Sequence, residues 1–325
     1  MTRTLITRRL TTIAGALALV VAAGCGAPAE RTFLTIATAG TGGVYYPLGG
    51  ALAQIYSAAL PGVNASAQST VGSVFNVQAV QQGRADVAFT MGDIAWFAYE
   101  QGTDSDPTPH RKLRTLAVLY QNTVQIVARR DGPLHTIADL RGQRVGVGAP
   151  GSGTEVSARV VIEAHGLSYA DVRPDYLSFA EVAAQMQDRT LDAGVVTASF
   201  PVSAITDASM TVGVRLLPVS DEALARIRAQ YPFFTRVTIP AGTYRGQDED
   251  VPTVAVENLL VVSEDLDEQL AYDLTRLLFE SLEELGRTHV AAKEIDVADA
   301  ATAPIPLHPG AERYYRERGV LPAVP

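Results

Sequence analysis

The chain has one cysteine, Cys25, among its 325 residues, and a lone cysteine cannot form an internal disulfide. Positive charge is also scarce, with 26 Lys and Arg against 35 Asp and Glu and a formal net charge of -9. The segment before Cys25 holds three arginines and no acid, so the charge without it is -12. This excess of negative charge argues against nucleic acid as a partner. An anionic ligand would have to be bound by local groups, because the overall field would repel it.

Long apolar runs are missing beyond the N-terminus, where none approaches the ~18 residues that a membrane-spanning helix needs. Residues 1–24 begin with three arginines and continue with an apolar run over 13–23, which is too short to cross a bilayer comfortably. This order predicts a signal peptide. Because Cys25 follows directly, we predict a lipoprotein-type signal with cleavage before Cys25, a lipid on that residue, and a polar tether over 25–32.

The signal predicts an extracytoplasmic protein, in the periplasm or on the outer face of the cytoplasmic membrane, with the lipid on Cys25 as its anchor. Ala22 stands where lipidation signals usually have Leu or another larger aliphatic residue. An ordinary signal peptide that is cleaved nearby therefore stays open as the alternative.

Catalytic and metal-binding patterns are missing as well. The five histidines have neither H-x-x-x-H nor H-E-x-x-H spacing, which argues against a zinc site. No P-loop pattern occurs, and Ser152 lies outside any G-x-S-x-G with no His–acid pair placed to activate it. The 35 carboxylates are spread too evenly to nominate a catalytic pair. We therefore predict no enzymatic activity, no cofactor and no metal.

Glycine, in contrast, is concentrated in loops that precede helical patterns. The stretch Gly40–Gly50 follows an apolar run over 33–39 and leads into a helical pattern over 48–60. The first N–H groups of a helix have no internal partner, and together with the helix dipole they favour an anion. Pro47 suits the first helical turn, because its missing N–H would have no partner there. The alternative is that these glycines only shape a tight turn.

A second glycine loop, residues 149–154, follows an apolar strand pattern over 144–148 and opens another helix. The match of Gly146–Gly151 to G-x-G-x-x-G could indicate a dinucleotide site. We do not favour that interpretation, because Pro150 lies inside the loop and the signal exports the chain to where NAD is scarce.

Residues 33–95 and 144–200 follow the same plan of alternating strands and helices, which predicts an α/β fold of two similar domains with mostly parallel sheets. In open α/β sheets the ligand lies beyond the carboxyl ends of the strands. We therefore expect a cleft between the domains, lined by the loops that follow strands, at 40–46, 70–73, 90–93, 151–154 and 197–201.

The remaining patterns set the domain boundaries. We predict separate strands over 113–120 and 124–128, an irregular segment over 231–242, a strand over 253–263, one helix over 266–285 and a last helix over 311–318. The chain would pass between domains near 121–124 and again near 252–254, which gives a two-strand hinge. Domain 1 is then predicted over 33–122 and 254–325, and domain 2 over 123–253.

Several motifs in series resemble the TAXI family, the TRAP-associated extracytoplasmic immunogenic solute receptors. They span the mature chain and lie at 40–53, 70–73, 85–87, 151–154, 239–244 and 308–315. The resemblance implies a type II periplasmic-binding-protein fold that delivers a small solute to a TRAP permease. Known members bind glutamate, glutamine or dicarboxylates. The chain departs from the family pattern at Met91 and Gly92 and at Ser199 and Phe200, which predicts a pocket less polar than that of the glutamate binders.

The predicted function is therefore capture of a small carboxylate between two domains, for a TRAP permease, by a monomeric receptor. A binding lipoprotein of an ABC importer and an exported hydrolase are the alternatives. Thr41, Ser73, Ser152 and Thr154 would supply hydroxyl groups, although Ser73 and Thr154 could instead cap helices. The complete predicted ligand-binding set is Thr41, Gly42, Gly43, Tyr45, Thr70, Ser73, Asp93, Ser152, Gly153, Thr154 and Ser199.

Overall fold

The computed structural model describes residues 32–322. The predicted signal peptide, most of the tether and Cys25 lie outside the described residues, so their predicted roles stay untested. Within the described part, no helix is both long enough and apolar enough to cross a membrane.

One lobe of the molecule, lobe 1, is built on a parallel three-stranded unit. Its elements in order are β1 (Thr32–Ala37), α2 (Tyr45–Ala59), β2 (Val63–Gln68), α3 (Ser73–Gln81), β3 (Val87–Met91) and α4 (Gly92–Gln101). The strands lie in the order β2-β1-β3, and β1 pairs in parallel with both neighbours. Every residue of β3 is buried, which agrees with a sequence that is apolar except for Thr90.

The opposite lobe, lobe 2, repeats this arrangement. Its elements are η2 (Ile137–Leu140), β5 (Arg144–Gly146), α5 (Gly153–Ala164), β6 (Arg173–Asp175), α6 (Phe179–Gln187), β7 (Ala193–Ala198), α7 (Ser203–Thr211), β8 (Val214–Leu217) and α8 (Asp221–Gln230). The strand order β6-β5-β7, all parallel, mirrors β2-β1-β3. The repeated plan that the sequence indicates, and the mostly parallel α/β fold, are thereby confirmed.

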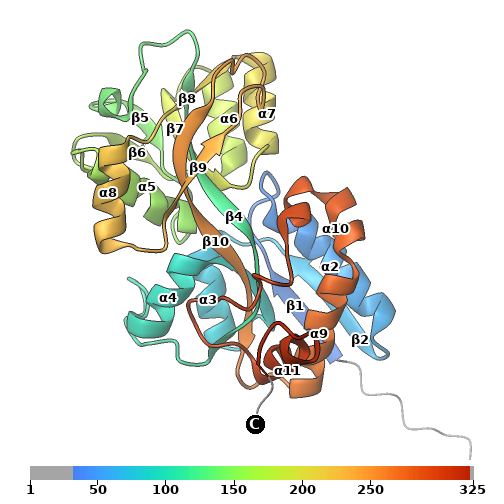
Figure 1. The fold of residues 1–325 in the computed structure, drawn as a ribbon. Coiled ribbons are helices and arrows are strands. Elements are labelled where there is room, and N and C mark those ends of the chain that lie inside the picture. The colour runs from blue at the N-terminus through green and yellow to red at the C-terminus, as the bar shows by residue number, and fades with distance from the viewer. Residues whose placement is uncertain (1–31, 323–325) are drawn as a thin grey trace, which may run out of the picture.

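Two long antiparallel strands, β4 (Leu113–Arg129) and β10 (Val251–Ser263), run through both lobes (Figure 1). They join the two parallel units into one sheet with the path β2-β1-β3-β10-β4-β7-β5-β6. The prediction of two separate strands over 113–120 and 124–128 is wrong, because the polar Gln121, Asn122 and Thr123 continue the ladder opposite β10. The two strands pair at the predicted crossing, where Thr123 faces Ala255.

Two further predictions are corrected. The segment 231–242 is not irregular, because β9 (Thr235–Ile239) pairs with the lobe-2 part of β10. The predicted helix over 266–285 is two helices, α9 (Glu268–Glu280) and α10 (Leu282–Thr288), separated at Ser281. The leucine spacing continues across Ser281, so apolar periodicity alone did not show the break.

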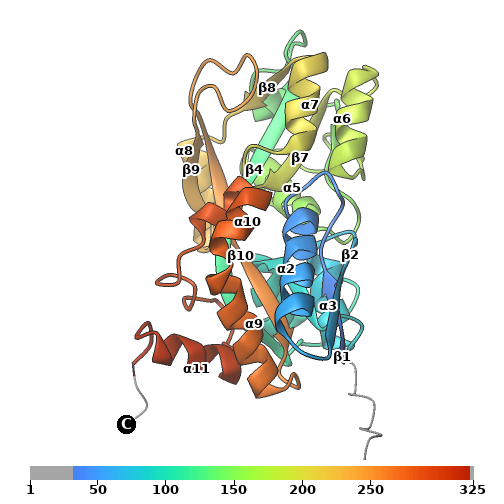
Figure 2. The same ribbon diagram turned by 90° about the vertical axis from the view of Figure 1, so that its right-hand side faces the viewer.

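The C-terminal helices return to lobe 1. After α10 the chain forms η3 (Val290–Glu294) and α11 (Pro309–Glu317), and α9, α10 and α11 lie on the lobe that carries α2 (Figure 2). The buried Tyr315 on α11 donates its hydroxyl to the carbonyl of Leu116 on β4 at 2.8 Å. The segment from α9 to α11 thus packs on the lobe that the first strands and helices form.

Neighbouring glycines on α2 predict opposite effects on stability. A Cβ at Gly49 would lie 2.4 Å from Thr38 Cγ2, whereas a Cβ at Gly50 would have nothing within 4 Å. We expect Gly49→Ala to lower the free energy of unfolding by about 1–3 kcal/mol through overpacking. Gly50→Ala should raise it by about 0.5–1 kcal/mol, because alanine loses less backbone freedom on folding. Urea unfolding of the two variants tests the pair, and equal shifts would contradict the close packing of α2 on β1.

Candidate functional site: a cleft between the lobes

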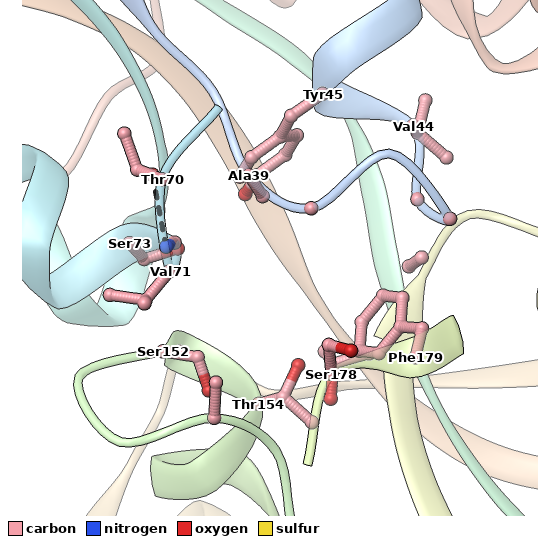
Figure 3. Close-up of a pocket in the computed structure, with 18 of the residues that line it drawn as sticks. Ala39, Val44, Tyr45, Thr70, Val71, Ser73, Ser152, Thr154, Ser178 and Phe179 are labelled. Atoms are coloured by element: carbon pink, nitrogen blue, oxygen red, sulfur yellow. Dashed lines mark hydrogen bonds between the residues drawn. The ribbon is translucent and has the colours of Figure 1, made fainter. Parts of the chain in front are cut away.

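A cavity of about 290 Å³ lies between the two lobes, at the carboxyl ends of the parallel strands. Figure 3 shows side chains of lobe 1, among them Tyr45 and Ser73, facing Ser152, Thr154 and Phe179 of lobe 2. The complete lining is Ala39, Gly40, Thr41, Gly42, Gly43, Val44, Tyr45, Ser69, Thr70, Val71, Gly72, Ser73, Met91, Asn122, Ala149, Ser152, Gly153, Thr154, Leu177, Ser178, Phe179, Ala180, Thr197 and Ala198.

Four helices begin at the wall of this cavity. Helices α2 and α3 start there from lobe 1, and α5 and α6 start there from lobe 2. Each N-terminus carries partial positive charge from its unpaired N–H groups and the helix dipole. Four of them around one cavity create a site that favours an anion.

The two lobes differ in how these helix ends are satisfied. Ser152 caps α5 by accepting from the N–H of Glu155, and Ser178 forms a capping box on α6 with Glu181. Both lobe-2 helices therefore have a side-chain cap and an acid in the first turn. Helices α2 and α3 have neither. The unneutralised positive ends thus belong to lobe 1.

Backbone donors at these two ends remain available for a ligand. In α2 the first two residues are Tyr45 and Tyr46, and in α3 they are Ser73 and Val74. Tyr45 and Ser73 line the cavity, and the other two residues follow them directly. None of these four N–H groups forms a hydrogen bond within residues 32–322. The next donor of α3, the N–H of Phe75, is instead bonded to the carbonyl of Gly151 across the cleft at 3.1 Å.

The lining carries no formal charge at neutral pH, since it contains no Asp, Glu, Lys, Arg or His. Its apolar members come from both lobes and include Val44, Val71, Met91, Leu177 and Phe179. An anion would therefore be bound by neutral dipoles, and its apolar part would contact these side chains. This agrees with the prediction, from Met91 and Gly92, of a weakly polar pocket.

Tyr45 presents its ring to the cavity and its hydroxyl to the protein. The hydroxyl donates to Oδ1 of the buried Asn258 and accepts from Nδ2 of Asn122 at 3.4 Å. The ring stacks on Phe89 with centroids 5.1 Å apart. Burial, and to a smaller degree the nearby charge of Asp93, raise the pKa of the Tyr45 hydroxyl well above its usual value. Tyr45 therefore acts in this geometry as a neutral, fixed wall of the cavity.

The structure places nine of the eleven predicted site residues on the cavity wall: Thr41, Gly42, Gly43, Tyr45, Thr70, Ser73, Ser152, Gly153 and Thr154. Four of their hydroxyls already have structural partners. That of Tyr45 is described above, and Ser73 Oγ accepts from the N–H of Met91 at 3.2 Å. Ser152 caps α5, and Thr70 lies at hydrogen-bonding distance from Asn76 Oδ1 and accepts from the N–H of Gly72. Thr41 and Thr154 form no side-chain hydrogen bond with other described residues.

The other two predicted residues, Asp93 and Ser199, are not among the lining residues. Asp93 is buried at the start of α4, where it accepts from the N–H of Ile94 at 2.8 Å. Ser199 is buried where the lobes meet and donates to Glu294 at 3.4 Å. Both residues follow strands, as expected for residues that line the cleft, but their side chains pack into the protein.

Sequence reasoning omitted several lining residues. Phe179 and Ser178 open a helix after a strand, so the capping box of Ser178 and Glu181 was the signal that could have placed them at the cleft. Asn122 lies in the predicted hinge, and Thr197 begins one of the loops expected to face the cleft. Val71 and Met91 lie in the loops 70–73 and 90–93, which the sequence predicts to face the cleft, although neither was named as a ligand-binding residue.

The lobes touch across the cleft, so the structure represents a closed form. Besides the bond from Phe75 to Gly151, Ser203 Oγ of lobe 2 donates to the carbonyl of Gly42 at 3.0 Å. A Cβ at Gly153 would lie 2.4 Å from Met91 Sδ and 3.0 Å from Ser73 Oγ. The glycine loop of lobe 2 therefore approaches lobe 1 as closely as a residue without a side chain allows.

Residues 36–319 match the NMT1-like family, which is nearly all of the described chain. The chain belongs to the NMT1-like family. This match is coarser than the TAXI resemblance, so membership of the TAXI receptors and a TRAP permease as partner remain predictions. No group of three or more potential metal ligands occurs within residues 32–322.

Solved structures of low sequence identity are similar in fold to this NMT1-like chain. A putative L-cystine ABC transporter protein from Listeria monocytogenes is 10% identical, with a TM-score of 0.50 over 82% of this chain and 98% of that one. The alkanesulfonate-binding protein SsuA from Xanthomonas axonopodis pv. citri, bound to MOPS, is 17% identical, with a TM-score of 0.49 over 89% and 85%. The fold of two similar α/β lobes joined by two long strands, which the sequence predicts, is confirmed by the strand order of the structure.

Proposed function

We propose that this protein is an extracytoplasmic solute-binding protein that captures a small carboxylate in the cleft between its lobes. The observation that carries the proposal is the convergence of four helix N-termini on one cavity with no charged side chain in its lining. Such a site attracts an anion and has no strong local charge that would bind a cation.

In this proposal, closure of the two lobes provides part of the binding affinity, and opening releases the solute. Each helix N-terminus contributes typically 0.3–1 kcal/mol to anion binding, and each hydrogen bond to a charged group roughly 1.5–3 kcal/mol. A few such bonds that exist only in the closed form would give micromolar or tighter binding. The predicted hinge is the place where the paired strands β4 and β10 pass from one lobe to the other. Bending there would allow the lobes to open and release the solute.

The proposed membrane partner is an ABC-type importer, as the matched Listeria protein is described as belonging to an ABC transporter. The TRAP permease implied by the TAXI resemblance is the other candidate. Uptake into vesicles that contain the cognate permease separates them. Dependence on ATP would favour the ABC system, and dependence on an ion gradient would favour the TRAP system.

An exported hydrolase is not supported by the site. Tyr45 is the only titratable residue in the lining, and its hydroxyl is already bonded to Asn258. The serines and threonines of the lining thus have no base beside them to activate a nucleophile.

Calorimetry with a panel of amino acids, oxo acids and dicarboxylates tests the proposed function. We expect at least one small carboxylate to give saturable heat with micromolar or lower Kd. Mass spectrometry of the solute that copurifies with the protein gives an independent answer. If no carboxylate binds and none copurifies, the proposal is wrong.

A further inference from the structure

Five of the carbonyl groups that border the cleft already accept hydrogen bonds. This contrasts with the four unpaired N–H groups at the starts of α2 and α3. The occupied carbonyls, with their donors, are Ala39 with Ser69 Oγ at 3.0 Å, Gly40 with Gly43 N at 3.2 Å, Gly42 with Ser203 Oγ at 3.0 Å, Ala149 with Ser152 N at 3.0 Å and Gly151 with Phe75 N at 3.1 Å. These five carbonyls, four of them in the two glycine loops, therefore have less capacity left to accept a hydrogen bond from a ligand than unpaired carbonyls would have.

A ligand with an ammonium group would be poorly satisfied by this wall. An ammonium ion is a donor only and carries a full charge, so its burial requires acceptors or an opposite charge. The lining contains no carboxylate, and the carbonyls named above are engaged. A second carboxylate on the ligand has a related difficulty. Of the four helix ends at the cavity wall, only the two of lobe 1 lack an acid in the first turn.

Thr197 provides an independent indication that a polar ligand atom is expected. Thr197 lies at the carboxyl end of β7, in the wall of the cavity, and is 4% exposed. Its Oγ1 is buried and has no hydrogen-bond partner within the described chain. A buried hydroxyl is normally satisfied, so an unpartnered one beside a cavity points to a group that the protein itself does not supply.

We propose, on the basis of the proposed function, that the cleft selects small organic acids with one anionic group and no ammonium group. The anionic group binds at the starts of α2 and α3, where the N–H groups of Tyr45, Tyr46, Ser73 and Val74 are unpaired. The Thr197 hydroxyl hydrogen-bonds the solute, and the apolar side chains of both lobes contact its body. The specificity expected from the TAXI resemblance, for glutamate or glutamine, is therefore not the one that this cleft favours.

Matched pairs of solutes test the selection. The probes are 4-methyl-2-oxopentanoate with leucine, and 2-oxoglutarate with glutamate, each titrated by calorimetry into the full mature protein. We expect each oxo acid to bind at least tenfold more tightly than its amino acid, and the monocarboxylate to bind more tightly than 2-oxoglutarate. An amino acid that binds as tightly as its oxo acid overturns the inference. Failure of all four probes also overturns it, whereas binding of another carboxylate in the wider panel would leave the proposed function intact.

Two isosteric threonine variants test the role of Thr197. Thr115 on β4 is also fully buried with an unpartnered Oγ1, but it lies outside the cavity lining. Thr197→Val should weaken binding of the tightest oxo acid about tenfold, while Thr115→Val should leave it within about twofold. Unfolding midpoints without solute serve as the folding control, because neither hydroxyl has a partner to lose. Equal affinities of the two variants would remove Thr197 from the site.

Discussion

Gly153→Ala is expected to weaken solute binding about tenfold to a hundredfold while the protein stays folded. The Cβ would lie 2.4 Å from Met91 Sδ and 3.0 Å from Ser73 Oγ, both on the opposite lobe. Met91 is 1% exposed, so its sulfur cannot move away freely. The overpacking cost of typically 1–3 kcal/mol arises only when the lobes close, and each 1.4 kcal/mol is a tenfold loss of affinity.

Calorimetry with the best solute of the panel measures this loss, and urea unfolding without solute checks the fold. Gly50→Ala is the matched control, because its Cβ meets nothing within 4 Å and it lies outside the cavity lining. Small-angle scattering adds a readout of closure itself: the variant should stay more extended than the parent at saturating solute. Unchanged affinity in Gly153→Ala would show that binding does not require the close approach of α5 to lobe 1.

Asp93→Asn is expected to change the pH dependence of stability. Burial raises the pKa of the Asp93 carboxyl from 3.8 to about 7, and the hydrogen bond from the N–H of Ile94 offsets only part of this effect. Its other oxygen, Oδ2, is buried without a partner among the described residues. The folded state thus binds this proton more tightly than the unfolded state does.

This difference in proton affinity decides whether stability rises or falls with pH. The stabilisation is complete below about pH 4 and is lost as pH rises towards 7, which destabilises the parent by up to about 4 kcal/mol at high pH. Asparagine has no proton to lose. Between pH 5 and pH 8 the variant should therefore gain about 2–3 kcal/mol in free energy of unfolding relative to the parent.

Urea unfolding of both proteins at the two pH values measures this gain, and any constant cost of the amide cancels in the comparison. Asp139→Asn gives a contrast of opposite sign, because hydrogen bonds from the N–H groups of His135 and Thr136 lower the pKa of Asp139. Parallel stability curves for the parent and Asp93→Asn would show that Asp93 is ionised in the fold at little cost.

The geometry suggests an order of events in solute capture. Lobe 1 holds the uncapped helix ends of α2 and α3, so it is the lobe on which an anion would bind first. Lobe 2 contributes capped helix ends, the side chain of Phe179 and the contact of Gly151 with Phe75. It would therefore close over a solute that is already bound, and closure would exclude water.

Most of the fold could be predicted from the sequence. The two errors in the predicted strands have physical causes. In β9, Thr235–Ile239 has ordinary strand residues, but the neighbouring prolines and aromatics obscured an edge strand that depends on β10 for pairing. The polar Gln121, Asn122 and Thr123 suggested a gap in β4, although residues between the lobes continue the ladder with side chains that bond across it. Both errors concern pairing between segments that are far apart in the sequence.

The sequence by itself determined the α/β repeat and the two glycine loops, because strand and helix periodicity and glycine–helix junctions are local properties. It thereby nominated nine residues that line one cavity. Tertiary structure alone decided that Asp93 and Ser199 turn away from that cavity and that Thr197 is left unpartnered there. It also decided that no charged side chain enters the lining. These features depend on where side chains from distant strands point after the lobes pack, which no local pattern records.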